Sequence, residues 1–400
     1  MSVKYNIINK SKNKLLFDII GDENIGLNKS IINAIRRTLH NYINVVGISE
    51  NSVEIHNNDT SLHNEFMKDR ISLMHIYLNS STYNKDYVFV IDVINDSTDV
   101  LKITSKDIDI YPLKKDILNS SLITSNDINN YDLSSKLTEK EKENILRPFE
   151  FESKKYYSLI TELPLNNTEP TKLKLYAYPS VYNGTNSSKY NNIACAFYTF
   201  KKDNNLFQSK LKEVIKIEKI KSKKDKEQFS KTFELSNSDR YYYRDHNNEP
   251  YWYEFNIESY TYESPKDLYI KSCSILIDQL NQFSEKLKLI LSDQEDTDIT
   301  ITMLKNDTSY QIKCTEHNES IIAMVQNKIV EDITDESLIT TCGYKKLHPL
   351  KTDIIINLSV KPHNYDINEM VTYLIKDILD SINKLQSQMN IMKDIADQDL

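Results

Sequence analysis

Apolar residues recur at helical spacing in some stretches of this chain and alternate with polar residues in others. The clearest helical stripe has members four residues apart: Leu27, Ile31, Ile35, Leu39 and Ile43. This spacing places them on one face of an amphipathic helix. Asn24 or Asn28 could cap the start of this helix, because an asparagine side chain accepts a hydrogen bond from a free backbone N–H of the first turn.

A second amphipathic helix is predicted over Ser61–Ile71. Its apolar positions Leu62 and Phe66, together with Leu73 just beyond it, are spaced to share one helical face. We therefore expect these three side chains to point into a core.

Two long helices are predicted over Pro265–Leu291 and Asn368–Met392. The apolar positions of the first alternate spacings of four and three, as a helix–helix seam requires: Tyr269, Cys273, Leu276, Leu280, Phe283, Leu287 and Ile290. The second helix carries a similar stripe of Val371, Leu374, Ile378, Ile382, Leu385 and Met389. The acidic tail after Met392 is expected to fray.

Short strands and one further helix complete the carboxyl-terminal region. Strands are predicted at Asp298–Leu304, Tyr310–Cys314 and Asp353–Val360. The helix is expected over Asn318–Val330, with one apolar face formed by Ile322, Val325 and Ile329. A turn is expected around Gly343.

The predicted class is α+β, with a discontinuous organisation. Residues 1–78 and 248–292 would form one dimerisation-type domain, interrupted by a β-rich insert at 79–204 and a charged connector at 205–247. Residues 297–400 would form a second, smaller domain. Both have short strands, an early helix and a long closing helix, and each apolar seam is wider than one small sheet needs. We expect the two seams to cover each other, so that the domains form a pseudo-heterodimer within one polypeptide.

Charge and cysteine usage narrow the functional classes. The formal net charge is −8, whereas proteins that bind nucleic acid extensively usually carry excess Lys and Arg. The four cysteines, Cys195, Cys273, Cys314 and Cys342, have no metal-ligand spacing. No long apolar run suggests a membrane span. We expect a soluble intracellular protein without a metal or cofactor, and without extensive nucleic-acid contact.

Two amino-terminal motifs resemble the alpha family of multisubunit RNA polymerases. Residues 28–39 read NKSIINAIRRTL and are similar to that family's Asn-Ala/Ser-Leu-Arg-Arg helix. Residues 61–74 read SLHNEFMKDRISLM and resemble its next helix, Val-Leu-x-x-Glu-Phe-x-x-x-Arg-Leu-x-Leu-Ile. The family includes the bacterial alpha amino-terminal domain, the larger alpha-like polypeptide of archaeal polymerase and the third-largest subunit of RNA polymerase II.

A third motif resembles the smaller partner of these subunits. Residues 342–350 read CGYKKLHPL and are similar to the Gly-Tyr-x-x-x-His-Pro-Leu turn of the smaller archaeal partner polypeptide and the eukaryotic eleventh subunit. The motif residues are Gly343, Tyr344, His348 and Pro349. One chain with both modules looks like the fused subunit of some large cytoplasmic DNA viruses, which implies a location in the host cytoplasm, with packaging in the virion as a further option.

The resemblance implies a non-catalytic platform that docks the two large catalytic polymerase subunits. Subunit docking would fall to Asn33, Arg36, Arg37, Glu65 and Arg70, and the face around Asn33, Arg36 and Arg37 would recruit the second-largest subunit. The largest subunit and small zinc-binding subunits would be further partners. The dimerisation core would comprise Ile31, Ile35, Leu39, Phe66, Leu276, Leu280, Phe283, Leu287, Ile322, Val325, Leu374, Ile378 and Leu385.

Simpler interpretations remain open for these signals. Arg36 and Arg37 could be an ordinary solvated pair of charges, and Glu65 and Arg70 could form surface ion pairs worth a few tenths of a kcal/mol. Arg70 could instead fix its helix against its own domain. The whole chain could be a stand-alone scaffold or homo-oligomer unrelated to transcription. An enzyme with a hidden site has the least support, because no phosphate loop, nucleophile elbow or paired acidic motif is recognisable.

Overall fold

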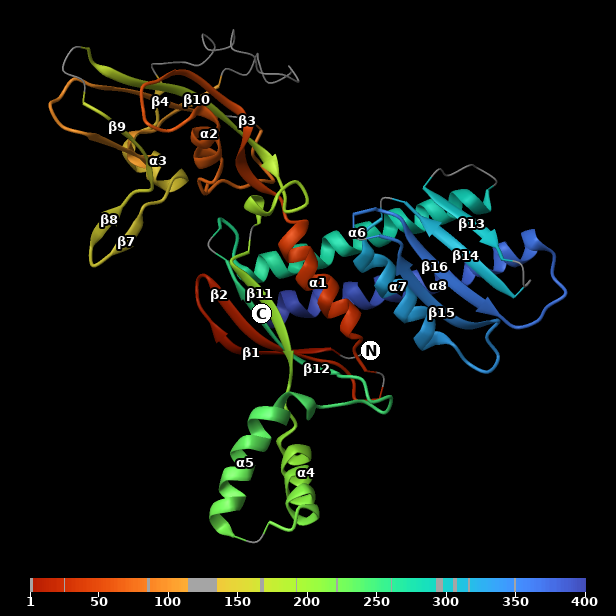
Figure 1. Ribbon diagram of the computed structural model, residues 1–400. Coiled ribbons are helices and arrows are strands. Elements are labelled where there is room, and N and C mark those ends of the chain that lie inside the picture. Colours follow the sequence, from red (N-terminus) through yellow and green to blue (C-terminus); the bar gives the residue numbers. More distant parts are fainter. Residues whose placement is uncertain are drawn as a thin grey trace. The chain divides into compact units, whose positions relative to one another are not determined.

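The chain folds into two compact units, each assembled from separate segments (Figure 1). This computed structural model describes residues 3–24, 26–84, 87–113, 135–165, 169–191, 193–220, 222–259, 261–292, 298–304, 308–315, 317–348 and 350–400. The first unit comprises residues 1–42, 193–259 and 264–400, and the second comprises 43–192 and 260–263. Both units combine helices with antiparallel sheets, which confirms the predicted α+β class. Within the described ranges, no helix has the length and apolar content needed to span a membrane.

The amino-terminal half of the first unit is built on one antiparallel sheet. Its strands lie in the order β1 (Lys4–Lys10), β2 (Lys14–Ile20), β12 (Trp252–Glu258) and β11 (Cys195–Phe200). Aromatic and branched side chains of β2 and β12 favour extended backbone and fill the covered face. Phe17 and Phe255 are cross-strand partners whose ring centroids are 5.7 Å apart.

The carboxyl-terminal half repeats this plan. Its sheet has the order β13 (Ile299–Met303), β14 (Ser309–Cys314), β16 (Ile354–Val360) and β15 (Ile339–Lys346). In both sheets the strands of the half, taken in chain order, lie as first, second, fourth and third. Helices follow the second and fourth strands in both halves. They are α1 (Lys29–Asn41) and α6 (Pro265–Leu291) in one half, and α7 (Glu319–Asp332) and α8 (Ile367–Asp399) in the other.

The four helices pack together into a core shared by the two halves. Helix α6 lies along α8, and α1 contacts both α6 and α7 (Figure 1). Polar side chains also join the halves: Gln386 donates to Asn281 at 2.8 Å, and Asn318 donates to Gln279 at 2.9 Å. The long helices predicted from their seams therefore lie against each other. Their fully buried members include Leu276, Leu280, Phe283, Leu287, Leu374, Ile378 and Leu385.

Local sequence explains where these helices begin. The Asn28 side chain accepts the backbone N–H of Ser30 at 2.8 Å, so Asn28 is the cap of α1. Ser264 caps α6 and is followed by Pro265, whose missing N–H costs nothing in the first turn. Asp366 opens α8 with a capping box.

The second unit has a sheet of its own, with the order β3 (Val45–Asn58), β10 (Thr171–Tyr182), β4 (Tyr87–Asn95) and β6 (Asp109–Pro112). Helix α2 (Asn64–Ser72) packs on this sheet through Met67 and Ile71. The remaining elements are α3 (Glu139–Ile145), the strand pair β5 (Leu101–Thr104) with β9 (Leu159–Leu163), and the hairpin β7 (Phe149–Phe151) with β8 (Lys154–Tyr156). Short 3₁₀ turns occupy Ser105–Asp107 and Ser188–Tyr190 in this unit and Ser238–Arg240 in the first unit.

A helical hairpin stands between β11 and β12 of the first unit. It consists of α4 (Asn204–Ile217) and α5 (Lys223–Asn237). The helices meet through a small core of Phe207, Leu211 and Phe233. The backbone N–H of Asp203 donates to the Tyr241 carbonyl at 3.0 Å, which closes the base of the hairpin.

The compact units divide the chain elsewhere than the sequence predicted. The second unit begins at Ile43 rather than at residue 79 and ends at Asn192 rather than at 204. The cause is pairing of β3 with β10, which are far apart in sequence. This pairing removes β3 and α2 from the predicted dimerisation domain. The predicted connector at 205–247 contains the α4–α5 hairpin, and residues 297–400 belong to the same unit as the amino-terminal strands.

Several local predictions are wrong. Phe66 is 68% exposed, because α2 turns Met67 and Ile71 toward the sheet instead. Leu73 is exposed for the same reason. Gly343 lies within β15, where it pairs with Asn357, and does not form a turn. The acidic tail continues α8 to Asp399, since Met392 and Ala396 keep one face buried.

Candidate functional site

A polar ridge runs along α1 opposite its buried face. Ile31, Ile35 and Leu39 are buried, whereas Asn33, Arg36 and Arg37 are half-exposed. The Nε and Nη2 atoms of Arg36 both donate to the Asn33 Oδ1 atom, at 3.1 and 3.0 Å. Asn33 and Arg36 are three residues apart, so they are neighbours on the helix surface. Asn33 therefore fixes the direction in which the guanidinium of Arg36 points.

The charged groups of the ridge are the guanidinium groups of Arg36 and Arg37. In the described part of the chain, no Asp or Glu oxygen lies within 4.0 Å of either guanidinium. Guanidinium groups are fully charged at neutral pH and present a planar fork of donors. The N–H groups of the ridge that do not bind Asn33 can consequently contact carboxylates or carbonyls of another protein.

Arg37 also connects the two halves electrostatically. Burial raises the pKa of the Tyr344 phenol on β15, and the Glu319 carboxylate raises it further. The positive charge of Arg37 opposes both effects on this pKa. The structure thus brings an arginine of the first motif close to a tyrosine of the third motif, although they are more than 300 positions apart in sequence.

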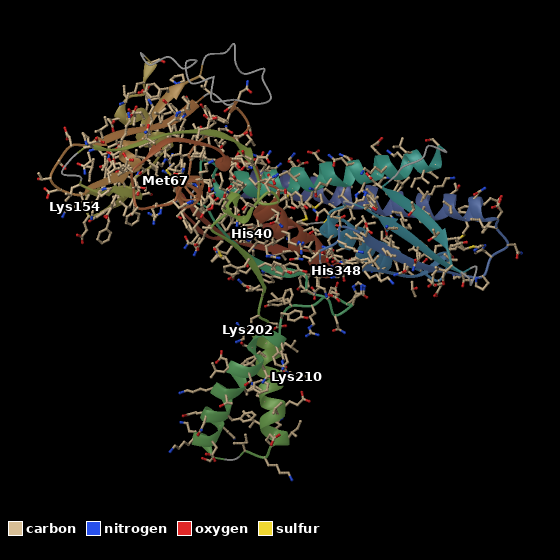
Figure 2. The ribbon with its side chains drawn as sticks, turned by 45° about the horizontal axis from the view of Figure 1, so that its top comes forward. His40, Met67, Lys154, Lys202, Lys210 and His348 are labelled. Carbon is tan, nitrogen blue, oxygen red and sulfur yellow. The ribbon has the colours of Figure 1, made fainter. Side chains whose placement is uncertain are left out.

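His348 of the third motif makes local hydrogen bonds just beyond β15. His348 is exposed, and its Nδ1 atom accepts the backbone N–H of Leu350 at 3.1 Å. The His348 carbonyl accepts the N–H of Lys351 at 3.0 Å. Figure 2 labels His348 beyond the strand that carries Tyr344. Pro349 lies outside the described residues.

Glu65 and Arg70 lie on α2 in the second unit, whereas the α1 ridge belongs to the first. The Glu65 side chain is 89% exposed. Arg70 Nη1 donates to the Ile160 carbonyl of β9 at 2.8 Å, so this arginine fixes α2 against its own unit. Phe66 and the C-cap residue Leu73 are both exposed, so α2 leaves two large apolar side chains on its outer surface. Sequence reasoning missed this surface, because it assigned both residues to a core.

Contacts between the halves were also missed from sequence. The Asn28 side chain caps α1 and at the same time donates to Glu331 Oε1 of α7 at 2.6 Å. The Tyr5 hydroxyl donates to the Met392 carbonyl at 3.1 Å. The sequence around Asn28 or Tyr5 does not show which distant residue either side chain will bind.

Two of the four cysteines, Cys273 and Cys342, are poor nucleophiles in this fold. Burial raises the pKa values of the Cys273 and Cys342 thiols to about 12 each. Both thiols therefore stay protonated at neutral pH, and the thiolate is the reactive form. Within the described ranges, no group of three or more His, Cys, Asp and Glu side chains could hold a metal ion.

No protein-family model matches this sequence, and no curated protein matches it at a significant level.

Proposed function

We propose that this chain is a non-catalytic assembly platform of a DNA-dependent RNA polymerase. The observation that carries the proposal is the repeated sheet-and-helix plan of the two halves, whose helices share one core. It is supported by the order of the three motifs, two in the first half of the sequence and one near its end. In this proposal the two halves correspond to the larger and smaller alpha-type subunits and form a pseudo-heterodimer.

Physical chemistry supports a permanent association of the halves. Their contact is made of large apolar side chains, as in obligate dimers, which commonly bury more than about 2,000 Å². Joining the partners in one chain supplies an effective concentration on the order of millimolar. A rigid platform of this kind can bind two large subunits without any chemistry of its own.

The α1 ridge is the proposed contact for the second-largest polymerase subunit. Arg36 is held in place by Asn33, and Arg37 stands beside it without a carboxylate partner in the described part of the chain. Arginines held in this way are frequent binding hot spots. The largest subunit would bind elsewhere on the platform, and small zinc-binding subunits would join the first contact. The exposed α2 surface, with Glu65, Phe66 and Leu73, is a further proposed contact.

The test is co-purification of the polymerase subunits with tagged variants expressed in the native source. Arg36→Ala with Arg37→Ala should lower recovery of the second-largest subunit at least about tenfold, because hot-spot arginines contribute about 2 kcal/mol or more each. Circular dichroism should show an unchanged fold. Lys223→Ala with Lys224→Ala removes the same charge from the exposed α5 and should leave recovery unchanged. Equal recovery with the arginine variant would refute the docking role.

A stand-alone scaffold or homo-oligomer is the second candidate. It is favoured by the hairpin β7–β8, where Phe149, Phe151 and Tyr156 are more than half exposed. Such aromatic residues suit a protein–protein contact. Analytical ultracentrifugation of the pure chain distinguishes the two functions, since a scaffold of this kind would self-associate and would recover no polymerase subunits. The polymerase proposal also implies that the pure chain makes no RNA, and that in a large DNA virus it acts in the host cytoplasm.

A further inference from the structure

The α4–α5 hairpin has a charge opposite to that of the rest of the chain. Between residues 210 and 231 the sequence contains nine lysines and four carboxylates, in a protein whose formal net charge is −8. A basic segment in an acidic protein creates a local positive potential, because exposed charges more than about 10 Å away are largely screened by salt. The hairpin can therefore attract a polyanion that the remaining surface repels.

Two lysines near the base of the hairpin, Lys202 and Lys210, are paired with carboxylates, whereas the lysines around the connection between α4 and α5 have no carboxylate partner among the described residues. At the base, Lys202 pairs with Glu234 at 3.2 Å and lies 4.3 Å from the ring centre of Phe207. Lys210 pairs with Glu213 at 2.8 Å. Figure 2 labels Lys202 and Lys210 along this stem.

The lysine tip comprises Lys216, Lys219, Lys223 and Lys224, around the connection between α4 and α5. All four are exposed, and none has a carboxylate within 4.0 Å among the residues that the structure describes. Each ammonium group is therefore available to a ligand.

The hairpin core holds this tip in a defined shape. The rings of Phe207 and Phe233 are 5.6 Å apart, and those of Phe233 and Tyr241 are 6.1 Å apart. Aromatic pairs at such distances stabilise a contact by about 1 kcal/mol beyond burial. Because these rings face the hairpin core, the tip offers cationic groups and no aromatic surface for stacking bases.

The chemistry of the tip favours phosphate over a protein partner. Lysine is depleted in protein–protein interfaces, whose centres are aromatic or contain arginine. Lysine ammonium groups contact phosphates as point charges, and such contacts carry no sequence information. The aliphatic Ile217 is exposed beside the tip, but one aliphatic side chain is a small anchor for a protein.

We propose that the lysine tip binds the phosphodiester backbone of a polynucleotide, either duplex DNA or single-stranded RNA, without reading the base sequence. The contact is confined to the hairpin, which is consistent with the acidic balance of the whole chain. The inference goes beyond the assembly function and does not depend on it.

The experiment measures binding of the full chain to fluorescent duplex DNA and to single-stranded RNA, by anisotropy between about 50 and 200 mM salt. The wild type should bind at low salt and release as salt rises. Lys216→Gln, Lys219→Gln, Lys223→Gln and Lys224→Gln combined should weaken binding at least about tenfold at the lowest salt. On duplex DNA, the slope of log affinity against log salt should fall by up to about 3.6, because each lost phosphate contact removes about 0.9.

The matched control neutralises four exposed lysines on other elements: Lys12, Lys140, Lys154 and Lys376. It changes the net charge equally and should retain wild-type binding. Equal losses in both variants, or no binding by the wild type, would overturn the proposal. Tighter binding to polyglutamate of equal charge than to either polynucleotide would also overturn it and would indicate an acidic protein. Whichever polynucleotide binds more tightly identifies the source of the phosphates. The variant of the lysine tip should still co-purify with polymerase subunits. Failure of the polynucleotide proposal can therefore be distinguished from failure of the assembly proposal.

Discussion

The hydroxyl of Tyr5 donates a hydrogen bond to the carbonyl of Met392 at 3.1 Å, which ties the first strand of the chain to its last helix. The same hydroxyl lies 3.1 Å from the Tyr269 hydroxyl on α6. One buried phenol thus contacts the amino-terminal sheet and both long helices. The contact lies where the two repeated halves meet.

Replacing Tyr5 with Phe should destabilise the protein by about 1 kcal/mol, because a typical intramolecular hydrogen bond contributes that much and the Tyr269 hydroxyl loses a partner. Urea denaturation would measure the change in unfolding free energy. Tyr156→Phe is the control, since Tyr156 is half-exposed on β8 and its hydroxyl bonds to none of the described residues. Equal stability of both variants would contradict a structural role for the Tyr5 hydroxyl.

The helix seam predicts a large effect for a single truncation. Leu280 of α6 is fully buried, so Leu280→Ala should lower the unfolding free energy by about 2–5 kcal/mol through lost burial and a cavity. Leu235→Ala on α5 should change it by less than about 0.5 kcal/mol, because Leu235 is 88% exposed. Thermal or urea unfolding would compare the two. If they behave alike, the α6 seam is not a core.

The buried phenols predict unfolding at high pH. Burial raises the pKa values of Tyr5, Tyr253 and Tyr269 well above the ordinary value of about 10. The unfolded state therefore releases these protons first as pH rises, so their contribution to stability is complete below about pH 10 and is lost above it. With three such groups, the unfolding free energy should fall by about 4 kcal/mol per pH unit in that range.

Tyr253→Phe isolates one of these groups. It should reduce the steepness of the alkaline loss by about one third, although it also removes the hydrogen bond from Tyr253 to the Leu27 carbonyl at 2.6 Å. The measurement is a series of urea titrations from neutral pH to about pH 11. A slope identical to that of the wild type would show that Tyr253 is not a source of the pH dependence.

Phe66 and Met67 should respond in opposite ways to truncation. Met67 is fully buried under the second sheet, so Met67→Ala should destabilise that unit by about 2–5 kcal/mol. Phe66→Ala should leave stability within about 0.5 kcal/mol, because its ring is exposed. Under the polymerase proposal, Phe66→Ala should instead lower the recovery of polymerase subunits. Limited proteolysis would measure stability, and pull-down would measure the recovery of polymerase subunits. A loss of stability with Phe66→Ala would show that this ring packs in a core after all.

The segment of residues 61–74, which contains α2, illustrates why sequence alone assigned the wrong helical face to the core. Leu62, Phe66 and Leu73 satisfy helical spacing, and so do Met67 and Ile71. Periodicity identifies candidate faces but not the neighbour against which one of them packs. Contact with the β3–β10–β4 sheet decides in favour of Met67 and Ile71.

In the candidate site, too, the sequence predicted the position of residues on a helix but not their distant neighbours. The sequence located Asn33, Arg36 and Arg37 on the outer side of an amphipathic helix, and the exposed ridge of α1 agrees with that placement. It could not indicate that Tyr344 lies near Arg37, because their proximity depends on packing between the halves. It also could not indicate that Arg70 bonds to the Ile160 carbonyl.

The sequence by itself determined the helices α1, α6, α7 and α8 and most of their buried stripes, because these depend on apolar spacing within a few turns. The tertiary structure decided the strand orders, the unit boundary at Ile43 and the strand conformation of Gly343. Those features depend on hydrogen bonds between strands that are distant along the chain. A local pattern specifies that a segment is extended, but its partner is chosen only when the whole sheet and its covering helices assemble.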